Sequence, residues 1–304
     1  MPHTQPKAAT RTAKLMVIVL AFAWGFTWIS SAIALREMPP WSLRFAGTGI
    51  GAVTLITVAI LSGHTLHVPR GERIHVMIAG LLNVAAFQVL GAFAQTSGTT
   101  SRTVIISYSM PIWATLLSRL MLGERLNAIR GLALVLCAAG LGILVWPLVT
   151  HGIPLSVFFA LGCALSWALA TVYLKWLKAT VTPLANAAWQ LVFGFLFIAA
   201  GTFLFDGYPR LWPIGIEAFA AVLFIGVFGM GFAHFLWWTI VGRLPTTTAS
   251  IGALLVPVVG VIAAAVLLGE RPTTPDIAGF VLIFAAAACV LLQPPPKPMK
   301  TASA

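Results

Sequence analysis

Three polar side chains near the centres of long apolar stretches are the first candidates for binding a solute. His234 is the only imidazole at such a depth, and it aligns with Gln88 at an offset of 146 residues. Asn83 lies one and a half helical turns before Gln88. These groups can bind a carboxylate or an amide of a solute, or they can be satisfied by a neighbouring helix or by water. Both interpretations remain open for each residue.

Aromatic residues at the same depth form a second group of candidates. Packing alone does not readily explain the seven internal tryptophans, which are Trp24, Trp28, Trp113, Trp167, Trp189, Trp237 and Trp238. An aromatic wall stacks on apolar side chains and offers an ammonium group a cation–π contact of roughly 0.5–2 kcal/mol. Trp24 and Trp167 are favoured because they align at an offset of 143 residues. Tyr108 and Trp238 complete the aromatic candidates.

Arg44 and two prolines are the remaining candidates. Arg44 lies about one turn inside an apolar stretch, where it either extends toward the lipid headgroups or binds a substrate carboxylate. Pro111 and Pro257 lie in the middle of two other stretches. Proline removes a helical hydrogen bond and crowds the preceding turn, so each predicts a break that exposes polar backbone and acts as a hinge, or else a simple kink.

The composition shows which elements must position these residues. Of 304 residues, 60% are hydrophobic and 8% are charged, which excludes a water-soluble protein. The net charge of +11 comes from scattered single residues, so nucleic acid is not an expected partner. A bilayer needs roughly 20 apolar residues per helix. We therefore predict an all-α integral membrane protein with ten transmembrane helices, at 14–35, 41–63, 74–95, 99–122, 127–147, 152–177, 182–206, 214–242, 245–268 and 273–292.

The distribution of basic residues predicts the orientation of the chain. If the N-terminus is internal, 13 of the 18 Lys and Arg residues fall on the inner side, four fall on the outer side, and Arg44 lies within a helix. The positive-inside rule then places the tails at 1–13 and 293–304 in the cytoplasm. The short connections suit a bacterial cytoplasmic (inner) membrane. Trp41, Trp146, Trp176 and Trp212 are expected to anchor helix ends at the interface.

The sequence also contains two related halves. Leu-Gly-Glu-Arg at 122–125 recurs at 268–271, an offset of 146, and at the same offset Pro111 matches Pro257 and Gly80 matches Gly226. Each unit, 14–147 and 152–292, contains five predicted helices. Because five is odd, the second unit must enter the membrane from the opposite side. Inverted repeats around a central cavity are typical of transporters that alternate between two faces of a membrane.

Several motifs extend this pattern to a known family. They are "LRFAGTGIGA" in the second predicted helix, "SMPIWATLLSRLMLGERL" in the fourth and "LLVPVVGVIAAAVLLGERP" in the ninth. From residue 14 to 292 the chain resembles the drug/metabolite transporter superfamily, specifically its EamA family, and is similar to bacterial exporters of aromatic and other amino acids. The resemblance implies a basket of helices around a central cavity, with the fifth and tenth helices at the periphery. Arg44 matches the Arg of the family pattern.

The acidic residues bear on how transport is driven. All seven lie at helix ends or in connections: Glu37, Glu72, Glu124, Asp206, Glu217, Glu270 and Asp276. Carboxylates are common proton carriers in coupled transporters, so proton coupling would depend on His234 or on no side chain. We therefore expect facilitative or weakly coupled transport. His64, His67 and His75 lack companion ligands and the three cysteines are scattered, so neither a metal nor a cofactor is expected.

Together these observations predict a transporter, not an enzyme, that exports amino acids or related small metabolites by alternating access. The expected partners are a small-molecule substrate and the lipid bilayer, and a monomer is the working expectation. Another solute class of the same superfamily, namely a nucleotide sugar, a sugar phosphate or a drug-like cation, is the alternative. A lipid-linked transferase within the membrane is disfavoured, because its acids and histidines should gather at one depth.

Overall fold

The fold is all-helical in a computed structural model that describes residues 7–124, 126–147, 152–243 and 246–291. Side chains at 7–14, 238, 241–243, 246–254 and 290–291 lie outside the described part. The helices are α1 (Lys7–Ala34), α2 (Pro40–Leu61), η1 (Arg70–Glu72), α3 (Arg73–Gly80), η2 (Leu81–Ala86), α4 (Phe87–Thr96), α5 (Thr100–Ser107), α6 (Met110–Leu122), α7 (Ala128–Val145), α8 (Leu155–Leu177), α9 (Pro183–Phe205), α10 (Ile216–Leu223), η4 (Phe224–Phe232), α11 (Ala233–Arg243), α12 (Thr246–Leu267) and α13 (Thr274–Leu291).

These helices follow the predicted membrane segments closely. Eight are long and apolar enough to cross a membrane, and Leu255–Leu267 and Thr274–Cys289 form shorter apolar helices within the described residues. The protein is therefore a multi-pass membrane protein, while ten crossings remain a prediction. The helix α1 begins at Lys7, so residues 7–13 of the predicted tail are helical. Alanine, lysine and arginine in this segment are good helix formers, which explains the extension.

The outer surface of the bundle is apolar, as contact with lipid requires. Val53, Leu120, Leu204 and Val266 are each more than two-thirds exposed and project from different helices. Because lipid solvates such side chains and water does not, these surfaces fit a bilayer. Trp41, one of the expected interface anchors, is half-buried near the start of α2 and stacks on Phe205, with the two ring centroids 5.3 Å apart.

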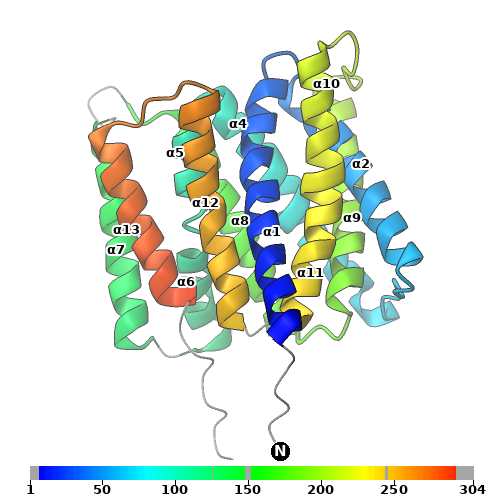
Figure 1. The fold of residues 1–304 in the computed structure, drawn as a ribbon, viewed down its shortest axis with the longest axis horizontal. Coiled ribbons are helices and arrows are strands. Elements are labelled where there is room, and N and C mark those ends of the chain that lie inside the picture. The colour runs from blue at the N-terminus through cyan, green and yellow to red at the C-terminus, as the bar shows by residue number, and fades with distance from the viewer. Residues whose placement is uncertain (1–6, 125, 148–151, 244–245, 292–304) are drawn as a thin grey trace, which may run out of the picture.

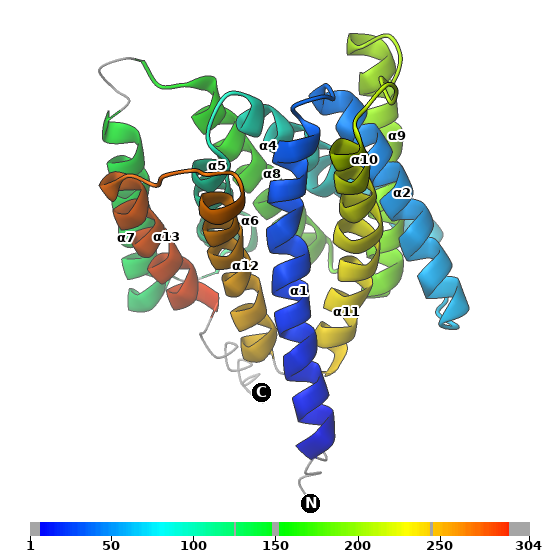
Figure 2. The ribbon, with the colours of Figure 1, turned by 45° about the horizontal axis from the view of Figure 1, so that its top comes forward.

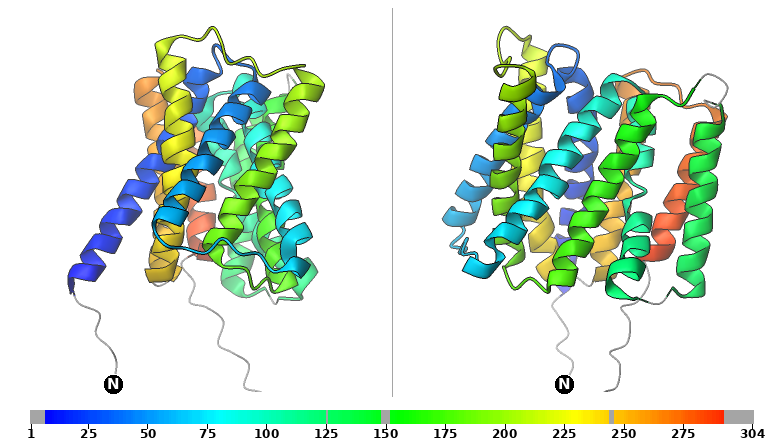
Figure 3. Two further views of the ribbon diagram at one scale, coloured as in Figure 1. Left: turned by 90° about the vertical axis from the view of Figure 1, so that its right-hand side faces the viewer. Right: turned by 180° about the vertical axis from the view of Figure 1, so that it is seen from behind.

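The bundle has two faces, which we name by the ends of the chain. The terminal face is where α1 begins and α13 ends, in the lower part of Figure 1, and it contains the α6–α7 and α8–α9 connections. The distal face contains the α1–α2, α4–α5 and α12–α13 connections. The same arrangement is seen from the other side of the molecule (Figure 3). Both described ends of the chain thus lie on one face, as the sequence predicts.

Helices of the first predicted unit, 14–147, pack against helices of the second predicted unit, 152–292. The α7 and α13 helices pack together at one end of the bundle (Figures 1 and 2). The α1–α12 contact has a counterpart in α8–α6, and the α2–η4 contact has one in α9–η2. Glycine permits the closest approaches: Gly226 in η4 lies against Ile50, and Gly194 in α9 lies against Val84.

The two central prolines behave differently. Before Pro111 the chain leaves the helix at Tyr108 and Ser109, and Pro111 is in the first turn of α6, as predicted. Pro257 lies inside the continuous helix α12, so of the two alternatives left open for it the structure shows a helix without a break. The Ser109 hydroxyl donates to the Ile106 carbonyl at 2.6 Å, which satisfies backbone exposed by the break. The position that matches Ser109 is Leu255, which has no polar group for that purpose.

Candidate functional site

A cavity of about 840 Å³ occupies the centre of the bundle. Its deep end is lined by Ser31, Arg44 and Ile105, near the distal ends of α1, α2 and α5. It continues to Glu124 and Lys175 beside the α6–α7 and α8–α9 connections. Among the described residues, none that lines the cavity belongs to a distal connection. The cavity therefore reaches the terminal face and is closed toward the distal face.

The structure gathers the predicted site residues around this cavity. The candidates that line it are Trp24, Arg44, Asn83, Gln88, Tyr108, Pro111, Trp167, His234 and Pro257. They come from both halves of the chain; Tyr108 lies in the turn between α5 and α6, and the others lie in eight helical elements. The side chain of Trp238 lies outside the described part. Binding by these residues remains a prediction, because their position alone does not identify a ligand.

Trp24 and His234 meet at a π-helical segment. Both the indole nitrogen of Trp24 and Nδ1 of His234 bond to the Gly229 carbonyl in η4, at 3.1 and 3.3 Å. The two rings are edge to face with centroids 5.6 Å apart. A π-helix widens the backbone ladder and is frequent at functional sites. One nitrogen of His234 is therefore satisfied by the backbone, while the ring still lines the cavity.

The two predicted amides also contact other side chains. Gln88 donates to the Met230 sulfur at 2.9 Å, and Asn83 donates to Gln190 at 2.8 Å. Gln190 and Asn186, which lie one turn apart in α9, also line the cavity. The side-chain oxygen of Asn186 is buried without a hydrogen-bond partner. An unsatisfied acceptor of this kind is costly unless water or a solute donates to it.

Arg44 is buried inside the bundle, so the interpretation that it extends to the headgroups is wrong. Its side chain starts near the distal end of α2 but lies against α1, where one terminal nitrogen donates to the Ser31 hydroxyl at 2.8 Å. The residue is 5% exposed, and its Nε has no partner. The ion pairs of the described residues involve Arg102, Arg130 and Lys175. A buried guanidinium without a carboxylate is energetically unfavourable and is stabilised by an anion.

The aromatic wall of the cavity contains more residues than the two favoured tryptophans, Trp24 and Trp167. Trp28, Phe87 and Trp237 also line the cavity. Trp28 lies four residues after Trp24, and that spacing places both on one face of a helix, a signal that sequence reasoning missed. Two other internal tryptophans do not line it: the Trp113 indole donates to Ser109 and the Trp189 indole donates to the Leu66 carbonyl.

The mouth of the cavity at the terminal face is charged. Glu124 bonds to Lys175, and Arg130 donates to Glu124 at 3.1 Å. The hydrogen bond from Lys175, aided by Arg130, lowers the pKa of Glu124 below its usual value. The Glu124 carboxylate is therefore ionised at neutral pH.

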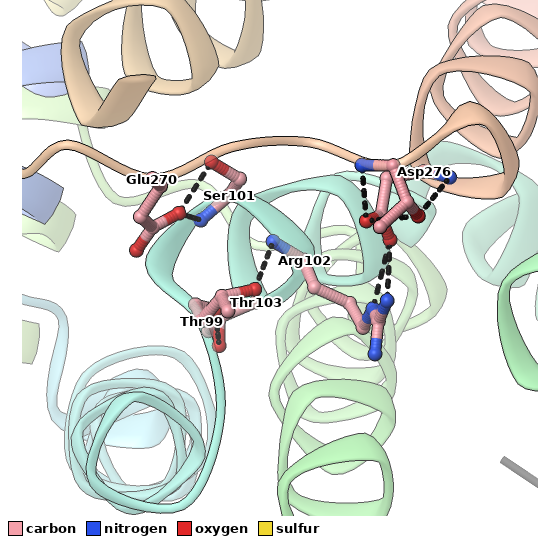
Figure 4. A network of polar contacts seen from close by, with 7 residues as sticks. Thr99, Ser101, Arg102, Thr103, Glu270 and Asp276 are labelled. Carbon is pink, nitrogen blue, oxygen red and sulfur yellow. Dashed lines mark hydrogen bonds and ion pairs between the residues drawn. The ribbon is translucent and has the colours of Figure 1, made fainter. Parts of the chain in front are cut away.

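A polar network closes the distal face between α5 and the α12–α13 connection (Figure 4). Glu270 accepts hydrogen bonds from the backbone nitrogens of Thr100 and Ser101, at 2.6 and 2.8 Å, and from the Ser101 hydroxyl. Arg102 forms an ion pair with Asp276 at 2.6 Å. The carboxylate of Glu270 thus caps the first turn of α5, where the helix dipole favours negative charge.

The described residues do not bring together three histidine, cysteine or acidic side chains as a metal site. Of the three histidines considered in the sequence, His75 forms a hydrogen bond between its Nδ1 and the Tyr173 hydroxyl, at 2.5 Å. Absence of a metal and of a cofactor stays a prediction.

Comparison with known proteins gives a consistent result. The sequence model of the EamA-like transporter family matches residues 11–146 and again 154–292. An uncharacterized transporter of Bacillus subtilis, YvbV, is 31% identical, and the match covers 90% of this chain and 89% of that protein. A protein of Salmonella typhimurium described as a probable amino-acid metabolite efflux pump is 23% identical over 91% of this chain and 93% of its own length.

A solved structure supports the fold. A crystal structure of a protein with 21% sequence identity superposes with a TM-score of 0.65, covering 92% of this chain and 98% of that chain. At this identity the likeness shows the fold alone.

Proposed function

Since the chain belongs to the EamA-like transporter family, we propose that it exports amino acids, aromatic ones included, or related small metabolites by alternating access. The family and its transporter relatives indicate a transporter, not an enzyme. The similarity to the probable efflux pump of Salmonella typhimurium favours an amino-acid solute. The membrane is the bacterial cytoplasmic membrane, with both termini in the cytoplasm, so the cavity opens to the cytoplasm.

Arg44 is the observation that carries the substrate proposal. It places a buried, fixed positive charge at the deep end of the cavity, with Nε free to donate. A carboxylate matches the planar guanidinium and offsets the cost of burying its charge. The neighbouring Ser31 hydroxyl orients the guanidinium at 2.8 Å. The solute therefore binds with its carboxylate toward the distal face.

The rest of an amino acid is accommodated by the aromatic wall. Trp24, Trp28 and Trp167 offer faces to an apolar side chain and to an ammonium group. The volume of about 840 Å³ lies within the roughly 300–1,000 Å³ usual for small-molecule sites.

The lining also favours facilitative or weakly coupled transport. The acid that lines the cavity is Glu124, and it lies at the mouth and pairs with two basic residues. A proton carried deeper in the cavity would then be carried by His234, whose ring contacts that of Trp24.

Alternating access is proposed to use two inverted units, 14–147 and 152–292. Support comes from the double family match and from helix contacts that recur when the units are exchanged, such as α2–η4 and α9–η2. A solute with a phosphate is less compatible, because phosphate sites usually combine several basic groups. Here Arg130 and Lys175 are engaged by Glu124, which leaves Arg44 alone at the deep end.

The test is exchange of labelled amino acids into proteoliposomes preloaded with unlabelled solute, with and without a pH gradient. Labelled tryptophan, phenylalanine and leucine are compared. Arg44→Ala is expected to reduce exchange by about 30-fold or more, because a buried charge pair loses one partner. Arg36→Ala, which removes an exposed arginine at the distal face, is the matched control.

Competition by tryptamine identifies the recognised group. Tryptamine keeps the indole and the ammonium group but lacks the carboxylate, so it should compete weakly with tryptophan. Equal competition by the two compounds would contradict the role of Arg44. Absence of exchange for every amino acid tested would overturn the proposed solute class.

A further inference from the structure

Two identical turns lie on opposite faces of the protein. Each follows a helix with Leu-Gly-Glu: Gly123 after α6 and Gly269 after α12 have φ of 67° and 69°. In each, the glutamate backbone nitrogen bonds to the carbonyl six residues before it, Glu124 to Ser118 and Glu270 to Ala264, both at 3.3 Å. The two glutamates therefore leave their turns in the same local geometry.

Their tertiary partners are nevertheless different. At the distal face Glu270 caps α5 through Thr100 and Ser101, at 2.5–2.8 Å. We name this the distal contact. At the terminal face Glu124 bonds to Lys175 and Arg130, and it lines the mouth of the cavity. The distal contact is thus made on the face where the cavity is closed, whereas on the face where the cavity is open the described partners of Glu124 are two basic side chains.

The sequence contains the residues for a counterpart of the distal contact at the terminal face. At the offset of 146 that relates Glu124 to Glu270, Thr100 matches Thr246 and Ser101 matches Thr247. Thr246 is the first described residue of α12, and Thr100 is the first residue of α5. Both helices therefore begin at matching positions with two hydroxyl residues.

Other acidic contacts show that this difference is specific. At the distal face Glu37, after α1, accepts from the Gly215 nitrogen before α10 at 2.5 Å. At the terminal face Glu72, before α3, accepts from the Thr180 nitrogen after α8 at 2.8 Å. The Glu37 contact on the distal face and the Glu72 contact on the terminal face are thus both made in this structure. The Leu-Gly-Glu turns differ because one face is open.

The geometry points to Glu124 and Glu270 as paired closing residues of the transport cycle: Glu270 holds the distal face closed by capping α5, and Glu124 closes the terminal face in the opposite state by capping α12 at Thr246 and Thr247. We call that second cap the terminal contact. When it forms, Glu124 exchanges Lys175 and Arg130 for backbone nitrogens, and Glu270 releases α5. This inference rests on the proposed alternating access but does not depend on the solute.

The test measures which face admits a membrane-impermeant maleimide to the cavity. Thr27→Cys, a cavity-lining position, is introduced after replacing Cys137, Cys163 and Cys289 by alanine. A separate Tyr208→Cys variant, exposed in the distal 206–215 connection, identifies the vesicles in which the reagent reaches the distal face. Labelling rates are then measured from each side for the parent and each glutamate variant.

Glu270→Gln should increase labelling from the distal side by about tenfold, because the cap loses its charge. Ser101→Ala removes one neutral donor and should increase it by about threefold. Glu124→Gln should do the opposite and reduce distal labelling below the parent, because it weakens the state that is open there. The distal labelling rate of the double variant should lie between the rates of the two single variants.

Glu217→Gln is the matched control, since Glu217 is exposed at the start of α10 on the distal face. It should leave both labelling rates within about twofold of the parent. Unchanged distal labelling in Glu270→Gln, or an equal increase in both glutamate variants, would overturn the inference and leave Glu270 as a helix cap only. Because labelling requires no solute, this result is independent of the amino-acid exchange assay.

Discussion

The distal and terminal faces contain the same turn but use it differently. Glu270 caps α5 in a network closed to the cavity, whereas Glu124 pairs with Lys175 and Arg130 at the cavity mouth. The local sequence is the same in both, so the difference comes from the packing of the helices that meet each glutamate. Duplicated sequence thus defines equivalent parts, and the conformational state decides which of them are in contact.

The two central prolines provide the same kind of comparison. Pro111 follows a break at Tyr108 and Ser109, whereas Pro257 lies in an unbroken helix. Here the difference has a local cause, because the Ser109 hydroxyl donates to the Ile106 carbonyl in the broken segment, whereas leucine occupies the matching position. The two halves are therefore equivalent in topology without being equivalent in flexibility.

Replacing the prolines tests that comparison with the largest expected effect. Pro111→Ala restores a backbone donor and allows the helix to close across Tyr108, so we expect exchange to fall about tenfold. Pro257→Ala changes a helix that is already continuous and should alter exchange by less than about twofold. Initial rates in proteoliposomes measure both. Equal losses in the two variants would mean that the break has no special role.

Ser109→Ala sharpens the same comparison with a smaller effect. The hydroxyl donates to Ile106 and accepts from the Trp113 indole at 3.0 Å, in a buried position. Its loss should reduce the free energy of unfolding by about 0.5–1.5 kcal/mol. Thermal unfolding in detergent measures this, with Thr96→Ala as control because its hydroxyl is exposed. An unchanged midpoint for Ser109→Ala would show that the break does not need the hydroxyl.

The distal ion pair gives the smallest effect. Arg102 and Asp276 pair across α5 and α13, but the matching positions in the other half are Thr248 and Arg130, which cannot reproduce the pair. Arg102→Ala should therefore increase distal labelling of Thr27→Cys by about twofold without a mirrored effect at the terminal face. If Arg102→Ala increased distal labelling more than Glu270→Gln does, the ion pair and not the cap would be the main closing contact.

Much of the site was predictable, because polar and aromatic residues inside apolar helices are rare and costly. That argument identified Trp24, Asn83, Gln88, Tyr108, Trp167 and His234, all of which line the cavity. It could not show that Arg44 turns inward, since a long side chain near a helix end is compatible with either direction. It also missed Trp28, although the four-residue spacing from Trp24 was visible.

The sequence by itself determined the membrane class, the helix positions, the shared face of the two chain ends and the equivalence of the two Leu-Gly-Glu turns. These follow from hydropathy, helix length and local backbone preference, which depend on residues near each other in the chain. Only the tertiary structure decided that Arg44 is buried against Ser31, that α12 stays continuous through Pro257 and that Glu270 caps α5. The physical reason is that each depends on contacts between segments distant in sequence, or on which face of the protein is closed.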